Sequence, residues 1–325
     1  MAKKLVVQNI AEQDRLAYEE LAVELGTVFA QGKWLTTMAP HAHLLGIYLP
    51  DGQLIGGLVC DTTKLKVLEV ITPALLSPHC GLFYRVQSQN PSQQVSLDKS
   101  IAEAIAEWLK GQPQRAVLLP FPPTFNDMQV FTWAGYKVAP KYTYRIDLSA
   151  PLEEIRAHFS TSTRSVLKKA EDSGVKVEAL SDAPRIMKVL QEAMTSKKGS
   201  YSTPLSETQL TQLLQSDVAR VFIGRADEKD VAVALFVEDR NDLYYLVGGV
   251  HRDFAKSGAG TAVIWKGIEH AKQSQKRYFD FEGSMNPGIE HFFRGFGGEL
   301  TPYMQIAKAS FFERLLLRMK GRKEF

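Results

Sequence analysis

The sequence contains two segments that share one pattern when the chain is shifted by 162 residues. At this offset, residues 100–110 align with residues 262–272 without a gap. A Phe-x3-Gly-x4-Pro spacing falls in register in both segments, at Phe131, Gly135 and Pro140 and at Phe293, Gly297 and Pro302. Chance similarity between two helix and strand runs is the alternative. We favour two copies of one structural unit, which is what internal self-similarity usually reflects.

Hydrophobic periodicity predicts the same order of elements in both copies. Helix, strand, helix and strand are expected at 100–110, 115–119, 125–134 and 142–148, and again at 261–273, 277–282, 287–295 and 300–307. Ser149-Ala150-Pro151 separates the copies, and proline is typical of a strand end or a helix start. We therefore predict an α/β chain with mixed sheets and two domains, residues 1–150 and residues 151–325.

The composition excludes several classes of protein. Apolar residues make up 45% and charged residues 23%, as in ordinary globular domains. No apolar run reaches the ~18 residues of a membrane span, and we read no secretory signal at the start. Cys60 and Cys80 do not have the spacing of a metal site or a disulfide framework, so we expect no metal and a cytoplasmic protein. Outside residues 308–325 the charge is nearly balanced, which argues against a dedicated nucleic-acid surface.

Two carboxylates distinguish the second copy from the first. Leu118 and Pro120 of the first copy align with Asp280 and Glu282 of the second. Residues two apart on a strand share a face, and repulsion between two carboxylates raises a pKa. We predict Asp280 and Glu282 as catalytic proton acceptors. The alternative is that they bond the backbone amides that follow or pair with Arg294.

A glycine-containing loop at 251–260 leads from a predicted strand into a predicted helix. Gly258 and Gly260 allow backbone amides to approach an anion, and the start of a helix adds partial positive charge. We therefore predict that these two glycines bind the donor. The alternative is a loop that only turns the chain, because short glycine loops often do no more.

Other polar residues are candidates for binding donor or substrate. Two basic residues four apart on one helix face suit a phosphate, although a solvated basic face is the alternative. A polar segment at 195–204 is either a substrate wall or an ordinary surface loop. The candidates are Arg164, Lys168, Lys198, Tyr201, His251 and Arg294.

Several short motifs together resemble one family. They are Val28–Leu35, Thr163–Glu171, Arg277–Ser284, Gly288–Glu290 and Phe292–Gly297. In this order they resemble FemAB-like proteins, a branch of the GNAT acyltransferase superfamily. The resemblance implies two tandem GNAT-like domains with the acyl-CoA N-acyltransferase fold.

The same resemblance implies an N-acyl or aminoacyl transferase that forms an amide on an amine acceptor. Its donor is then acyl-CoA or aminoacyl-tRNA, with no tightly bound cofactor. The acceptor would be a small molecule or a cell-wall (peptidoglycan) or polysaccharide precursor. The alternative is a non-catalytic binder of acyl-CoA or of a nucleotide-linked precursor that retains the GNAT fold.

The C-terminal segment 310–325 mixes apolar and basic residues. This mixture is typical of a helix that rests weakly on an anionic membrane surface. It also suits a helix that caps its own domain. The sequence leaves both interpretations open.

Overall fold

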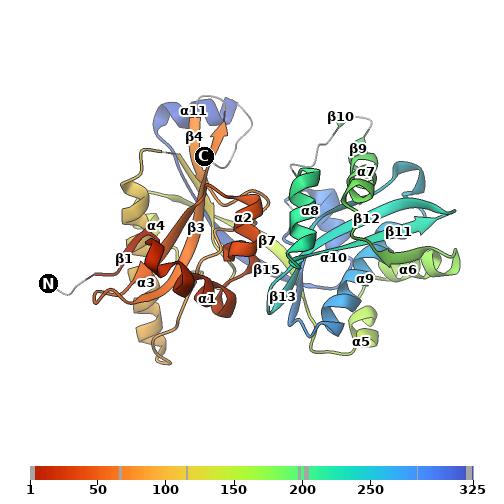
Figure 1. Cartoon of the computed structure of the whole chain (residues 1–325), viewed down its shortest axis with the longest axis horizontal. Helices are drawn as coiled ribbons and strands as arrows, with labels where there is room; N and C mark the ends of the chain where they lie inside the picture. The colour runs from red at the N-terminus through yellow and green to blue at the C-terminus, as the bar shows by residue number, and fades with distance from the viewer. Residues whose placement is uncertain are drawn as a thin grey trace. The chain divides into compact units, whose positions relative to one another are not determined.

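The computed structural model describes residues 4–65, 68–114, 116–196, 199–200, 205–283, 285–319 and 324 (Figure 1). The chain divides into two compact units. Unit 1 consists of Met1–Lys141 with Pro302–Phe325, and unit 2 consists of Tyr142–Thr301. Both units combine a mixed β-sheet with packed helices, as the sequence predicts.

The strands of unit 1 follow the order β1-β2-β3-β4-β6-β15, and β5 pairs with β3. The β4–β6 pair is parallel, and the other pairs are antiparallel. The elements of unit 1 are β1 (Val6–Asn9), η1 (Glu12–Asp14), α1 (Arg15–Leu25), η2 (Val28–Ala30), α2 (Gly32–Met38), β2 (His43–Tyr48), β3 (Leu54–Leu65), β4 (Leu68–Thr72), β5 (Phe83–Tyr84), α3 (Pro91–Lys110), β6 (Ala116–Pro120), α4 (Gln129–Trp133) and α11 (Phe311–Met319). The strands β7 (Lys137–Asp147) and β15 (Glu299–Lys308) cross the boundary between the units.

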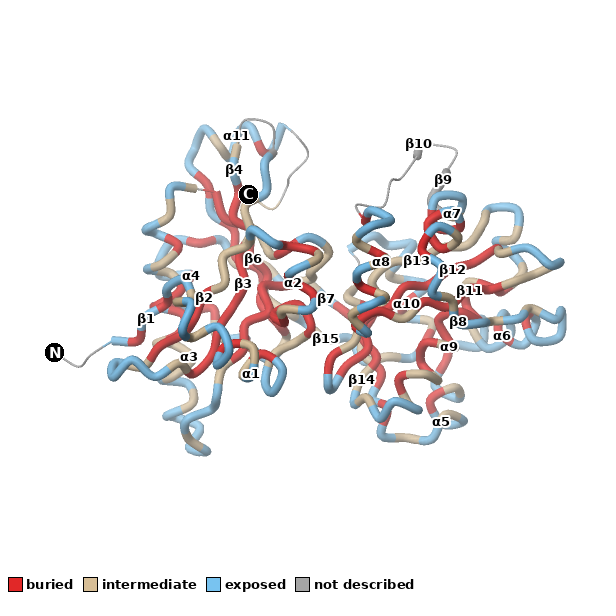
Figure 2. Tube along the Cα trace, viewed as in Figure 1, coloured by how far each residue is buried: buried red, intermediate tan, exposed pale blue. Residues whose placement is uncertain are grey.

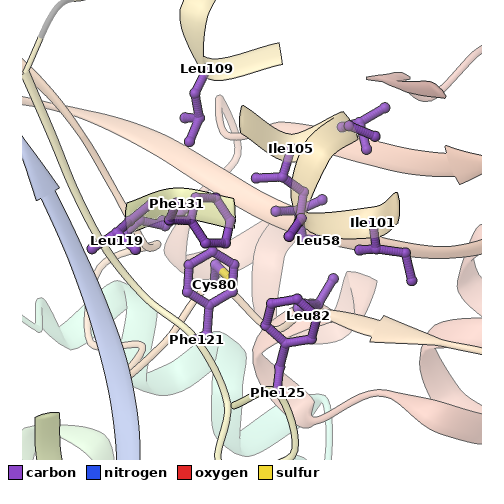
Figure 3. Close-up of a cluster of buried hydrophobic side chains, with 14 of the residues drawn as sticks. Leu58, Cys80, Leu82, Ile101, Ile105, Leu109, Leu119, Phe121, Phe125 and Phe131 are labelled. Atoms are coloured by element: carbon purple, nitrogen blue, oxygen red, sulfur yellow. The ribbon is translucent and has the colours of Figure 1, made fainter. Parts of the chain in front are cut away.

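Helix α3 supplies much of the core of unit 1. Its side chains at four-residue spacing, Ile101, Ile105 and Leu109, are buried in one cluster with Leu119 of β6 and with aromatic residues from the segments that follow β6 (Figure 3). The helix starts at Pro91, nine residues earlier than predicted. The side chain of Asn90 accepts hydrogen bonds from two backbone amides of the first turn, and Pro91 has no N–H group to satisfy.

The strands of unit 2 follow the order β7-β14-β13-β12-β11-β8. The β13–β14 pair is parallel, and its neighbours are antiparallel. The elements of unit 2 are α5 (Leu152–Ala157), α6 (Thr161–Asp172), β8 (Lys176–Ala179), α7 (Ala183–Met194), β9 (Thr195–Ser196), β10 (Gly199–Ser200), α8 (Glu207–Gln215), β11 (Ala219–Ala226), β12 (Lys229–Glu238), β13 (Asp242–Val250), η3 (Arg252–Phe254), α9 (Ala259–Gln273), β14 (Tyr278–Asp280) and α10 (Pro287–Arg294).

Helices α7 and α9 cover opposite faces of the unit 2 sheet. A Cβ atom on Gly249 of β13 would lie 3.1 Å from Ala193 Cβ of α7. The next strand residue, Val250, faces Gly260 of α9. Successive strand residues point to opposite faces, so the two helices enclose the sheet between them. The tube representation accordingly shows the central strands of this unit largely buried (Figure 2).

The last strand of each repeat pairs with the third-last element of the other repeat, so the two repeats exchange their last strands. The element order α3-β6-α4-β7 of the first copy recurs as α9-β14-α10-β15 in the second. However, β6 pairs with β15, whereas β14 pairs with β7. Gly135 and Gly297, aligned in the sequence repeat, both have positive φ, at 78° and 70°. The exchanged strands therefore follow equivalent glycine turns.

This exchange shifts the structural boundary away from residue 150. Residues 142–150 belong to unit 2, and residues 302–325 belong to unit 1. The expected division into 1–150 and 151–325 assigned each copy its own last strand. Local sequence signals such as Pro151 mark where a helix begins, but they do not show which sheet a preceding strand joins.

The exchange predicts how fragments will behave. A fragment of residues 151–325 lacks β7, so the edge of β14 loses its antiparallel partner. We expect this fragment to show no cooperative unfolding transition by circular dichroism. A fragment of residues 142–301 retains the β7 residues that pair with β14 and serves as the control, for which we expect a cooperative transition. The reverse result would contradict the structural division.

Candidate functional site

Strands β13 and β14 of unit 2 are neighbours, but they pair along only the first part of β13. Strand β14 pairs with β13 only through residues 278–280, opposite Asp242, Leu243 and Tyr244. Strand β13 continues to Val250, and a register shift against β12 leaves Leu246 without an opposite residue. Among the described residues, β14 makes no pairing with the second half of β13. Among the described strands, the second half of β13 therefore pairs only with β12.

Asp280 lies at the carboxyl end of β14, and its side chain is buried. Its Oδ1 atom accepts a hydrogen bond from Thr143 Oγ1 at 2.6 Å and another from the Glu282 backbone N–H at 2.8 Å. Its Oδ2 atom forms an ion pair with Arg145 Nε at 3.1 Å. Both oxygens are therefore engaged. This arrangement positions neighbouring groups rather than leaving a carboxylate open to substrate.

The same arginine joins Asp280 to a larger buried network. Arg145 Nη2 lies 2.6 Å from Asp242 Oδ2, and the Tyr244 hydroxyl donates to Asp242 and to Asp239 at 3.2 Å and 3.1 Å. Burial raises the pKa of Asp242 to about 7, and repulsion from Asp239 and Asp280 adds to the effect of burial. Burial also raises the pKa of Asp280, although Arg145 opposes this shift. One guanidinium does not neutralise three carboxylates, so the network favours a bound proton.

Glu282 occupies a different backbone setting from the one predicted. Strand β14 ends at Asp280, so Glu282 does not share a strand face with it; that prediction was wrong. Glu282 has φ of +56° and Gly283 has φ of +77°. A Cβ atom on Gly283 would lie 1.9 Å from the Tyr142 carbonyl oxygen. The close approach of β7 therefore forces the chain out of the strand at this point.

One oxygen of the Glu282 carboxyl group has no hydrogen-bond partner among the described residues. Its Oε1 atom is buried and accepts no hydrogen bond from any residue that the structure describes. Burial raises the pKa of Glu282 well above its usual range, and the charge of Asp280 adds to the shift. A carboxyl group with a raised pKa keeps its proton to a higher pH than an ordinary glutamate does. Asp280 accepts a hydrogen bond from the Glu282 backbone N–H and so holds the backbone of this residue.

The loop after β13 is fixed against helix α6. Gly258 has φ of +81°, and a Cβ atom there would lie 2.6 Å from the Val166 carbonyl oxygen. Lys169 Nζ donates to the Lys256 carbonyl oxygen at 3.0 Å. At Gly260 the nearest atom to a Cβ would be Val250 Cβ at 3.6 Å, an ordinary contact. Gly260 is the second residue of helix α9, and the first turn of an α-helix has N–H groups without intrahelical acceptors.

Arg164 and Lys168 lie one turn apart on α6, as predicted. Arg164 Nη1 donates to the carbonyl oxygens of Ala157 and Phe159 at 2.7 Å and 2.5 Å. The arginine therefore stabilises the chain between α5 and α6. Lys168 is exposed to solvent.

The side chains of His251 and Arg294 both interact with residues close to them in the sequence. His251 Nδ1 accepts a hydrogen bond from the Asp253 backbone N–H at 3.3 Å, which begins η3. Arg294 Nε pairs with Glu290 Oε1 at 3.2 Å, and the Tyr144 hydroxyl donates to the same oxygen at 2.6 Å. The alternative pairing of Arg294 with the two carboxylates is not seen in the structure.

Lys198 and Tyr201 lie outside the described residues. Within the described part of the chain, no group of three or more histidine, cysteine, aspartate or glutamate side chains is arranged to hold a metal ion. In the same part, no helix has the length and apolar character needed to cross a membrane.

Sequence reasoning missed most of the buried network. A signal was present in the strand before the boundary, where Arg145 interrupts the apolar residues Tyr144, Ile146 and Leu148. An arginine within a buried strand is rarely left unpaired. Its partners were not identifiable, because they come from strands almost 100 residues or more away along the chain.

Comparison with known proteins agrees with this architecture. Residues 157–294 match a family model described as an acetyltransferase (GNAT) domain. The search of curated proteins found no match. Among solved structures, FemX has 14% sequence identity and a TM-score of 0.66, with 98% of this chain and 100% of that chain covered.

Two further structures have the same fold. The C-terminal domain of a putative lysylphosphatidylglycerol synthetase from Agrobacterium fabrum is 12% identical with a TM-score of 0.60, covering 94% of this chain and 95% of that one. A tandem GNAT protein from the clavulanic acid biosynthesis pathway is 12% identical with a TM-score of 0.55, covering 94% and 98%.

The chain therefore has the GNAT acyltransferase fold, in two GNAT-like units. Its architecture is that of FemX, which confirms the predicted fold and the predicted resemblance to the FemAB-like branch. At these identities the similarity to solved structures establishes the fold alone.

The raised pKa of Asp242 predicts a pH-dependent stability. In the unfolded chain this carboxyl titrates near pH ~4. Its stabilising contribution is fully present below that pH and is lost as the pH rises through about 7. Relative to wild type, Asp242→Asn should therefore gain about 2 kcal/mol in unfolding free energy between about pH 5 and pH 7, measured by urea denaturation.

Asp253→Asn is the matched control, because the Asp253 side chain is 80% exposed. Its unfolding free energy should parallel that of wild type at every pH. An equal pH dependence in wild type and Asp242→Asn would refute the role of Asp242.

Proposed function

We propose that this protein is an N-acyl or aminoacyl transferase that forms an amide bond on an amine acceptor. The observation that carries the proposal is Glu282, whose buried Oε1 atom has no hydrogen-bond partner among the described residues, just beyond the point where β13 and β14 stop pairing. The match of residues 157–294 to an acetyltransferase (GNAT) domain supports the reaction class.

In the proposed reaction, the acceptor amine attacks the carbonyl carbon of the donor. The new C–N bond forms as the C–S bond of a thioester, or the C–O bond of an ester, breaks. A backbone N–H group of β13 beyond Tyr244 stabilises the negative charge that develops on the carbonyl oxygen. Glu282 accepts the proton from the amine, directly or through water, and the leaving thiolate or alkoxide takes up a proton.

In this proposal, the remaining residues of the site either position Glu282 or bind the donor. Asp280 holds the backbone N–H of Glu282, and Thr143 and Arg145 hold Asp280. The N–H groups at the start of α9, after Gly258, bind the phosphates of the donor. Lys168 is exposed on the adjacent helix α6 and contributes positive charge to the same phosphates.

We propose acyl-CoA or aminoacyl-tRNA as the donor and a cell-wall or polysaccharide precursor as the acceptor. The tandem GNAT protein of the clavulanic acid pathway is described in a form without AcCoA, and another structural neighbour is part of a lysylphosphatidylglycerol synthetase. Both donor classes should therefore be tested. Calorimetric titration with acetyl-CoA and free CoA is the first step. Saturable binding without turnover from any donor would instead favour a non-catalytic binder.

Replacing the proposed base tests the mechanism. Glu282→Gln keeps the size of the side chain but removes the proton acceptor. We expect kcat/KM to fall by about 10²–10⁴-fold. In the wild type, kcat/KM should rise with pH through the raised pKa of Glu282, because only the carboxylate accepts a proton. This rise should be absent in the variant.

The matched control is Glu207→Gln, since Glu207 is an exposed residue of α8. It should retain wild-type activity. An Asp280→Asn variant should lower kcat through displacement of Glu282 while keeping the pH-dependent rise. Unchanged turnover in Glu282→Gln would exclude the base assignment.

Alanine substitutions at Gly258 and Gly260 distinguish a glycine that contacts the donor from one that is needed for packing. Among the described residues, an added methyl group at Gly260 would come within 4 Å of Val250 alone, at an ordinary contact distance, so Gly260→Ala should fold normally. If donor phosphates approach the start of α9, this variant should bind the donor at least about tenfold more weakly in calorimetry. Gly258→Ala should instead lower the melting temperature, because its methyl group would overlap the Val166 carbonyl. Equal donor binding by wild type and Gly260→Ala would place the donor elsewhere.

A further inference from the structure

Helix α11 presents its larger apolar face to solvent. Phe311, Phe312 and Met319 are 74%, 75% and 76% exposed, and Leu315 and Leu316 are 53% and 40% exposed. These positions repeat at intervals of four residues along two adjacent rows, so they form one continuous face. We call these five residues the α11 face. Figure 2 shows most of this helix as exposed.

The exposure is not the result of a helix detached from its unit. On the opposite side, Leu317 is fully buried in a cluster with residues of β4, β6 and the end of β15. At the start of the helix, Ser310 N–H donates to Glu313 Oε2 at 2.9 Å, and Glu313 N–H donates to Ser310 Oγ at 3.4 Å. This reciprocal pair fixes the first turn. The fold therefore holds the α11 face outward.

Basic residues border the apolar face. Arg314 and Arg318 lie one turn apart on α11, and the segment 308–325 contains six basic and two acidic residues. An apolar helix face with flanking cations complements a bilayer that contains anionic lipids. The helix has nine residues and is about 14 Å long.

We propose that α11 is an interfacial helix that binds the protein reversibly to the surface of an anionic lipid bilayer. The aromatic and aliphatic side chains of the α11 face enter the boundary between headgroups and acyl chains, and the arginines contact lipid phosphates. This inference does not depend on the proposed transferase reaction. One short helix gives reversible binding, because stable anchoring requires a second signal.

The test measures co-sedimentation of the full chain with vesicles. Mixed phosphatidylglycerol and phosphatidylcholine vesicles should bind the protein, pure phosphatidylcholine vesicles should bind it less, and high salt should weaken the binding. The double variant Phe311→Ser and Phe312→Ser should lower partitioning by more than about tenfold. Arg314→Gln and Arg318→Gln should each lower it about fivefold. Replacement of both phenylalanines by tryptophan should preserve binding.

Control variants lie elsewhere on unit 1. Leu16 and Trp133 are 72% and 70% exposed, so Leu16→Ser and Trp133→Ser remove comparable apolar surface outside α11. Both should bind vesicles like wild type, and circular dichroism should show every variant folded. The proposal is overturned if the full chain does not bind anionic vesicles, or if serine at 311 and 312 has no effect. It is also overturned if the α11 face instead mediates self-association, seen as a dimer that the serine variant loses.

Discussion

The ion pair between Arg145 and Asp280 joins two strands that come from different repeats. The two residues are direct register partners in the β7–β14 pairing, and Thr143 reaches the same carboxylate. A buried ion pair adds little net stability, since desolvation offsets much of the attraction. However, a one-residue shift in the β7–β14 register would be unfavourable, because it would leave both charges buried and unpaired. The register of β7 in unit 2 therefore depends on this contact.

The corresponding contact of unit 1 contains no charge. There, Leu118 and Pro120 take the positions of Asp280 and Glu282, and they pair with Ala307 and Gln305 of β15. Unit 1 thus retains the strand pairing without the buried network. The loop at 89–98, aligned with 251–260, also lacks glycine. The two units share an architecture, and the buried carboxylate network and the glycine loop at 251–260 are found in unit 2.

Local patterns in the sequence were sufficient to predict most elements of the fold. Periodicity located the core helices, and the repeat predicted the shared order of elements and aligned Gly135 with Gly297, without indicating that both are turn glycines. Short edge strands such as β1 and β8 were missed, because four residues carry too little periodic signal. The strand exchange was also missed, since hydrophobic alternation specifies that a strand is buried but not which sheet it joins.

For the site, the repeat comparison identified Asp280 and Glu282, but it assigned them equal roles. The difference between them arises from the backbone, because the tight approach of Gly283 to β7 turns Glu282 into a left-handed conformation. Such a feature depends on tertiary contact and has no local signature. Arg164 shows the converse case: its charge suggested a ligand contact, yet its guanidinium binds the chain's own carbonyl groups.

The strand exchange has a consequence for synthesis on the ribosome. The chain emerges from its N-terminus, so the edge of β6 has no antiparallel partner until the ribosome has made β15, long after β6 itself. An unpaired apolar strand edge is a template for aggregation. Nascent chains of this protein should consequently have a long interval in which unit 1 needs protection, whereas β14 finds β7 already synthesised when it emerges.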